Sequence, residues 1–124
     1  MTQEQKDLLL KDLCGRLPFG VICKSVNFRD PVKLVSIDLD GPSHDVFFCT
    51  NDGGSMWNDY DDIKPYLFPL SSITKEQITD LTKFVANGIM DENIVYDWYN
   101  KNHIDYRGLI DKGLAIDATG LNIY

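Results

Sequence analysis

The sequence predicts an α+β protein: an N-terminal helix, then a curled antiparallel sheet or small barrel over about residues 19–63, then packed C-terminal helices. Apolar residues alternate with polar residues before residue 64, as in strands, and recur at helical spacing after residue 74. Pro65 and Pro69 stiffen the crossing between these patterns, because each proline fixes φ and removes a backbone donor. A length of 124 residues suits one domain. We therefore predict a single domain with two halves, residues 1–63 and 75–124, joined at a proline-rich seam, residues 64–74.

The first helix is predicted from its capping signals. Thr2 and Gln5 form a Thr-x-x-Gln capping box, in which each side chain bonds the backbone N–H of the other residue. Four leucines between residues 8 and 13 supply an apolar face. Gly15 is suited to the left-handed position that follows a helix, so we expect the helix to end at residue 13 or 14.

Strands are predicted over residues 19–28, 32–40 and 44–50, with a short fourth strand near residues 56–57. In the second strand the more apolar face, which we expect to point inward, consists of Val35, Ile37 and Leu39. The sequence Asn-Asp-Gly-Gly at residues 51–54 is a strong hairpin signal. Successive hairpins predict an antiparallel sheet, and a closed barrel of about five strands would leave no exposed edge.

The seam and the second half are predicted to pack together. We expect four apolar residues of the seam to be largely buried between sheet and helices: Tyr66, Leu67, Phe68 and Leu70. Thr74 and Gln77 form a second capping box at the start of a helix over residues 75–87. The inward face of this helix is predicted to hold Ile78, Leu81, Phe84 and Val85.

Two further helical segments are predicted after that helix. One begins at the cap residue Asp91 and ends near residue 102, with Trp98 on its inward face. The other is a short helical turn over residues 106–112, which stops at Gly113.

Charge and apolar content restrict the classes of partner. The net charge is −7, from 19 acidic and 12 basic residues, which argues against binding to nucleic acid or to anionic membranes. No apolar run reaches the roughly 20 residues needed to span a bilayer, and the N-terminus lacks the pattern of a signal peptide. We expect a cytoplasmic protein whose partner is another protein. An acidic protein can also imitate nucleic acid, which is an alternative.

The cysteines and histidines give no catalytic pattern. Three widely spaced cysteines form neither a disulfide framework nor a zinc motif, and Cys23 and Cys49 are predicted to be buried in strands. His44 and Cys49 are five residues apart on one strand, so they should point to opposite faces and cannot form a nucleophile–base pair. His103 is expected to satisfy carbonyl groups at the end of its helix.

An acidic stretch in the middle of the chain raises the question of a metal. Asp38 and Asp40 would share one face of a strand and could offer oxygen ligands to a divalent ion, with His44 nearby. The spacing of a calcium loop is absent, and we predict a solvated strand face with no metal and no cofactor. The alternative is a small metal-dependent hydrolase that uses Asp38, Asp40 or His44.

Two strings in the C-terminal half carry a family resemblance. They are Lys-Pro-Tyr-Leu-x-Pro-x-Ser-Ser at residues 64–72 and Asp-Tyr-Arg-Gly-Leu-Ile at residues 105–110. In these strings the chain resembles small uncharacterised proteins of Bacteroides and of the phages and mobile elements of these bacteria. The resemblance implies a bacterial or phage cytosol as the setting, and it implies no catalytic residue.

Aromatic and acidic side chains around the seam are the best functional lead. Trp and Tyr are enriched at the energetic centres of protein interfaces. The predicted binding residues are Trp57, Tyr60, Asp61, Asp62, Tyr66 and Phe68. The sequence therefore predicts a non-enzymatic module that binds or modulates another protein, encoded by a phage or mobile element.

Overall fold

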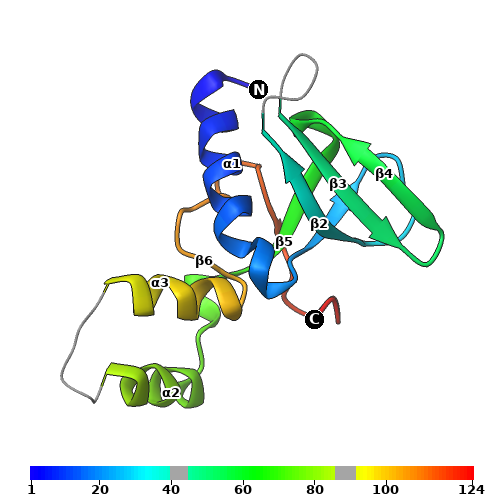
Figure 1. The fold of residues 1–124 in the computed structure, drawn as a ribbon. Helices are drawn as coiled ribbons and strands as arrows, with labels where there is room; N and C mark the ends of the chain where they lie inside the picture. Colours follow the sequence, from blue (N-terminus) through cyan, green and yellow to red (C-terminus); the bar gives the residue numbers. More distant parts are fainter. Residues whose placement is uncertain (40–44, 86–91) are drawn as a thin grey trace.

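The fold consists of an N-terminal helix, an open mixed sheet and a pair of C-terminal helices (Figure 1). The structure, a computed structural model, describes residues 1–39, 45–85 and 92–124. Figure 1 shows the β3–β4 hairpin at one end of the molecule and the helices α2 and α3 at the other. The helices are α1 (Gln3–Arg16), α2 (Lys75–Val85) and α3 (Glu92–Lys101). The predicted α+β class, with a helix, then strands, then helices, is confirmed.

In the described parts of the chain, seven strands form one sheet: five follow α1 and two short ones follow the helices. The strands are β1 (Ile22–Ser25), β2 (Val32–Asp38), β3 (Val46–Asn51), β4 (Gly54–Asn58), β5 (Ile63–Pro69), β6 (Ile104–Asp105) and β7 (Ile116–Asp117). Their order is β4-β3-β2-β1-β5-β6, with β7 also paired to β5. The first five strands pair in antiparallel fashion, whereas β6 and β7 run parallel to β5. Of the two predicted forms, the sheet takes the open one, and it does not close into a barrel.

The start of α1 is as predicted, but its end is not. The Thr2 hydroxyl accepts the Gln5 N–H at 3.1 Å, and the Gln5 side chain accepts the Thr2 N–H at 2.9 Å. The helix continues through Gly15 into a 3₁₀ turn, η1 (Leu17–Phe19), and Gly20 takes the left-handed position with φ +76°. A Cβ on Gly15 would lie 3.2 Å from Nδ2 of Asn100. Gly15 therefore allows α1 and α3 to approach closely, rather than ending the helix.

A bulge in β2 overturns the predicted inward face of that strand. Val32 and Leu34 are buried, whereas Val35 and Leu39 are exposed. The register with β3 shifts between Leu34 and Ser36, and one extra residue moves the rest of the strand to the opposite alternation. Ile37 therefore packs against the core, as predicted, while its expected partners do not.

The predicted seam contains a central strand. β5 pairs with three strands: antiparallel with β1, and parallel with β6 and β7. Tyr66 and Leu67 are buried as predicted, and Phe68 is half-buried. Leu70 is 48% exposed, contrary to the prediction, because the chain leaves the sheet there and turns through η3 (Leu70–Ser72).

The second capping box is confirmed, but the packing of α2 differs from the prediction. Thr74 and Gln77 exchange hydrogen bonds of 2.9 and 3.1 Å. Ile78 is 53% exposed and Leu81 is half-buried, because α2 packs on α3 and lies away from the sheet (Figure 1). Trp98 of α3 is buried as predicted, and its indole N–H donates to Asp80 of α2 at 3.3 Å. The predicted end of the first helix at residue 87 and the cap Asp91 lie outside the described residues.

Residues 106–112 do not form the predicted helical turn: the chain bends at Arg107 and then turns over residues 109–113. The carboxylate of Asp105 accepts the backbone N–H groups of Leu109 at 2.8 Å and Ile110 at 2.9 Å. Gly113, where the predicted helical turn was expected to stop, has φ +72°, and its N–H donates to the Ile110 carbonyl. The Asp105 side chain thus satisfies donors that a regular helix would have paired internally.

The main core lies between α1 and the sheet, and a smaller one lies under the C-terminal turns. The main cluster holds Leu9, Leu13, Val21, Cys23, Val32, Leu34, Phe47, Cys49, Tyr60 and Ile63. The smaller cluster holds Leu67, Leu109, Leu114 and Ala115. The prediction that Cys23 and Cys49 are buried is confirmed, and burial raises the pKa of the Cys49 thiol to about 11.

A buried ionic network joins α1 to the segment after α3. Asp12 and Arg16 have no exposed side-chain surface and form an ion pair of 2.8 Å. Asp12 also binds Arg107 at 2.8 Å, and Nη2 of Arg16 donates to the carbonyl of Ile104 at 2.6 Å. Because the partners are about 90 residues apart in sequence, this network fixes the C-terminal segment on the first helix.

His103 has a structural position, although not the predicted one. It follows α3 in the left-handed conformation, with φ +59°, and its ring stacks on Tyr124 with centroids 3.6 Å apart. Its Nδ1 is buried and has no hydrogen-bond partner among the described residues, so the imidazole does not cap the helix. Burial, and then the charge of Arg16, lower the pKa of His103 to about 4.

This lowered pKa predicts a loss of stability in acid. The unfolded chain, with a histidine pKa of about 6.5, binds a proton before the folded chain does, so stability falls as the pH drops from about 6.5 to about 4. His103→Asn keeps a residue that tolerates the left-handed conformation and removes the titration. Urea unfolding should show a smaller loss between about pH 7.5 and about pH 5 in the variant. We expect a difference of about 1 kcal/mol, roughly half the value for a fully buried ring, because the ring is partly exposed. An equal loss in both proteins would contradict the assignment.

Candidate protein-binding surface

The six predicted binding residues do not gather at one site. Tyr60 is buried, its ring packs edge-on against Phe47 at 5.1 Å, and its hydroxyl donates to Asp45 at 2.6 Å. Tyr66 is buried in β5, where its backbone carbonyl accepts the hydroxyl of Tyr124 at 2.8 Å. Both tyrosines therefore have structural roles.

Asp62 and Asp61 lie in η2 (Tyr60–Asp62), which connects β4 to β5. Asp62 accepts the N–H of Asp59 at 2.9 Å and so belongs to the capping box of this turn. The Asp61 side chain is 70% exposed and lies 4.0 Å from the terminal amino group of Met1. The two aspartates line a small pocket of ≈250 Å³ together with Lys24, Val26, Lys64 and Ile116.

Phe68, the last of the six, packs near the C-terminus of the chain. It is half-buried on β5, and its ring centroid lies 6.0 Å from that of Tyr124. Its backbone N–H donates to the carbonyl of His103 at 2.8 Å. Phe68 therefore helps to fix the end of the chain on the sheet.

Trp57 is the predicted residue that presents a large aromatic surface to solvent. It lies on β4 and is 48% exposed. Directly opposite on β3 is Phe48, and the two ring centroids are 4.9 Å apart with planes tilted by 46°. On the same face, two residues before Phe48, Val46 of β3 pairs with Asp38 of β2. The outer face of the sheet thus carries an aromatic pair, Phe48 and Trp57, beside the edge strand.

Sequence reasoning missed Phe48 because the Val-Phe-Phe run does not say which phenylalanine points inward. Phe47 and Cys49 are buried, which leaves Phe48 on the outer face. The hairpin signal at residues 51–54 could have placed Phe48 opposite Trp57. A two-residue turn pairs Asn51 with Gly54 and therefore fixes every later pair in the hairpin.

The segment of the sequence that contains this aromatic pair is acidic. Residues 45–62, which run from the start of β3 through η2, contain five aspartates and neither lysine nor arginine. Asp52 is exposed at the tip of the hairpin. A surface formed by this segment would repel acidic partners and attract basic ones.

The alternative metal site has one member in the described part of the chain. Asp38 is exposed at the end of β2, whereas Asp40 and His44 lie outside the described residues. Across residues 1–39, 45–85 and 92–124, no three or more His, Cys, Asp or Glu side chains lie together as metal ligands. A hydrolase based on Asp38, Asp40 or His44 stays a prediction, as does a nucleic-acid mimic.

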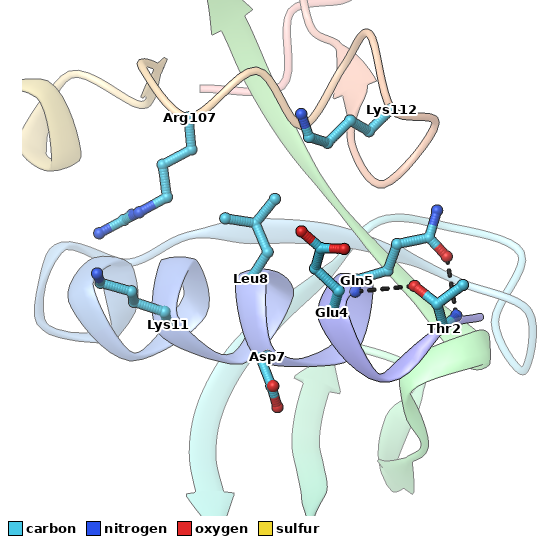
Figure 2. Close-up of a pocket in the computed structure, with 8 residues that line it drawn as sticks. All are labelled: Thr2, Glu4, Gln5, Asp7, Leu8, Lys11, Arg107 and Lys112. Atoms are coloured by element: carbon cyan, nitrogen blue, oxygen red, sulfur yellow. Dashed lines mark hydrogen bonds between the residues drawn. The ribbon is translucent and has the colours of Figure 1, made fainter.

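A groove that the sequence did not predict lies between α1 and the turns after β6 (Figure 2). It has a volume of ≈630 Å³ and is lined by Thr2, Glu4, Gln5, Asp7, Leu8, Lys11, Arg107 and Lys112. Figure 2 shows Arg107 reaching down from the loop after β6 and Lys112 extending alongside it, with Leu8 and Lys11 on the facing side of α1 and Asp7 directed away. Arg107 is held by Asp12, and Thr2 and Gln5 by their capping box. The lining contains neither a cysteine nor a histidine, so the groove offers contacts of both charges but no nucleophile–base pair.

Comparison with protein-family models, with curated proteins and with solved structures finds no match. Among the described residues, every helix is too short or too polar to cross a lipid bilayer.

Proposed function

We propose that this chain is a non-enzymatic protein-binding module, an accessory protein of a phage or mobile element, whose binding surface centres on Trp57. The proposal rests on one observation above all: a tryptophan that is 48% exposed and rests on Phe48 at the open edge of a sheet. An aromatic pair of this kind contributes little to the core. On binding a partner it would lose its remaining contact with water, which is the usual behaviour of a tryptophan at the centre of an interface.

The rest of the sheet supports this choice of surface. The inner face of the sheet is filled by α1 and the main core, whereas Trp57 and Phe48 lie on the outer face next to the edge strand β4. The predicted tyrosines Tyr60 and Tyr66 are buried and cannot contact a partner without unfolding. Trp57 is therefore the member of the predicted set that best fits a role as an anchor.

Site-specific cross-linking tests the proposal. A benzophenone amino acid placed at position 57 should, on irradiation in a lysate of a Bacteroides host, form a covalent adduct with a defined protein. The matched control carries the same group at position 96, because Tyr96 is also aromatic and 44% exposed but lies on α3. We expect the adduct from position 57 and not from position 96. The absence of any adduct from position 57, or the same adducts from both positions, would refute the proposed surface.

A further inference from the structure

Strand β4 is an edge strand without the usual protection against pairing. It pairs with β3, and no other described strand lies on its outer side. Natural edges are commonly blocked by lysine, proline or a bulge. The sequence of β4, Gly-Ser-Met-Trp-Asn, contains neither a charged residue nor proline, and its register with β3 is regular.

The accessible part of this edge is short and well defined. The first four residues of β4 are exposed, whereas Asn58 is buried. The Asn58 side chain accepts from Ser25 at 2.6 Å and from Asn27 at 3.0 Å, which ties the end of β4 to the β1–β2 turn. The free edge therefore runs over residues 54–57.

The register of the hairpin indicates which backbone groups this edge presents. Residues that flank a two-residue turn exchange hydrogen bonds, and along an antiparallel pair the bonded and non-bonded positions alternate. From the Asn51–Gly54 pair, the alternation assigns Ser55 and Trp57 to non-bonded positions. Their N–H and C=O groups then point away from β3, where an added strand would pair with them.

Charge distinguishes between two occupants of the edge. A second copy of the chain, paired edge to edge, would bring together two strands that are each flanked by Asp52 and Asp59, with no lysine or arginine between these aspartates. A basic segment of another protein would instead meet complementary charge, which raises the association rate and disfavours wrong partners. Apolar side chains of such a segment, at every second position, would lie beside Trp57 and Phe48 on the outer face.

We infer that β4 binds an extended basic segment of a partner protein, with alternating apolar residues, as an added strand of the sheet. This inference rests on the proposed binding function of the Trp57 surface and specifies how the partner is held. Main-chain bonds to Ser55 and Trp57 would supply part of the affinity, and the aromatic pair and the aspartates would supply selectivity.

A model peptide tests the inference directly. The probe is a synthetic peptide of alternating Lys and Val, about eight residues long, and the control replaces each Lys by Glu. Amide NMR titration of the ¹⁵N-labelled protein should show shifts concentrated in β4 with the Lys-Val peptide. We expect it to bind at least about tenfold more tightly than the Glu-Val peptide at low salt, and to weaken as salt is added.

Ser55→Pro separates strand addition from simple charge attraction, because it leaves the charge of the edge unchanged, and Ser55→Lys blocks the same edge in a second way. Ser55→Pro removes an outward N–H, and Ser55→Lys introduces a typical edge-blocking residue while keeping the backbone intact. Each should weaken binding of the Lys-Val peptide by about tenfold, whereas Ser55→Ala should change it by less than about twofold. The inference would be overturned if Ser55→Lys bound the Lys-Val peptide as well as the unchanged protein does, or if both peptides bound equally. It would also be overturned if the chain formed dimers that Ser55→Lys abolishes.

The two proposals fail in distinguishable ways. If position 57 cross-links a partner but Ser55→Lys and Ser55→Pro leave that adduct unchanged, the binding surface stands and strand addition is wrong. If no adduct forms at position 57, the proposed function fails, whatever the peptides show.

Discussion

Asp12→Ala is expected to lower the free energy of unfolding by about 3–5 kcal/mol. Asp12 is fully buried and is the anionic partner of both Arg16 and Arg107, each at 2.8 Å. Its removal leaves the guanidinium of Arg16, also fully buried, without a counter-charge, and the desolvation of that charge is then uncompensated. Urea denaturation at neutral pH measures the change.

Asp7→Ala on the same helix is the matched control. Asp7 is exposed and accepts one bond, from the Gln3 side chain at 2.9 Å. Its replacement should change the free energy of unfolding by less than about 0.5 kcal/mol. A loss for Asp12→Ala as small as that for Asp7→Ala would mean that the network does not hold the C-terminal segment on α1.

The second large effect is expected at Leu67. Leu67→Ala should lower the free energy of unfolding by about 2–5 kcal/mol, because Leu67 is fully buried in β5 and its truncation leaves a cavity beside Leu109 and Leu114. The expectation follows from the position of β5 as a central strand. A flexible seam at residues 64–69 would instead relax into the space.

Leu70→Ala provides the comparison. Leu70 is three residues further along the chain and 48% exposed, so its truncation should lower the free energy of unfolding by less than about 1 kcal/mol. Thermal or urea unfolding of both variants gives the contrast. Equal losses at the two positions would show that the strand does not end where the structure places it.

Local signals in the sequence predicted the features that depend on a few neighbouring residues. Both capping boxes form as expected, at Thr2 and Thr74. The turn at residues 51–54 forms the expected hairpin, and Trp98 faces inward from its helix. In each case the geometry is fixed by residues within one turn of helix or one tight turn of chain.

Features that depend on distant partners were not predictable. The inward face of β2 was assigned wrongly because a bulge, which depends on the pairing with β3, reverses the alternation after Leu34. Gly15 was predicted to end the helix, but it instead allows the close approach of Asn100, which lies 85 residues later in the chain. The same holds for β5, whose place in the sheet requires β6 and β7 from the other end of the chain.

The candidate site shows the same division. The sequence singled out Trp57 and its acidic surroundings but could not separate an exposed aromatic residue from a buried one. Tyr60 and Tyr66 carry the same composition signal as Trp57, yet the sheet buries both of them. Exposure is decided by which face of a strand packs on α1, and that depends on the whole fold.

The most direct test of the binding surface starts from the partner protein that cross-links to position 57. Once this partner is purified, its affinity is measured for two variants of this chain. Trp57→Ala should weaken binding by at least about 30-fold, or about 2 kcal/mol, as expected for a central aromatic anchor. Tyr96→Ala, at a similarly exposed aromatic position on α3, should weaken binding by less than about threefold. Unchanged affinity in a folded Trp57→Ala variant, or equal losses in both, would contradict a surface centred on Trp57.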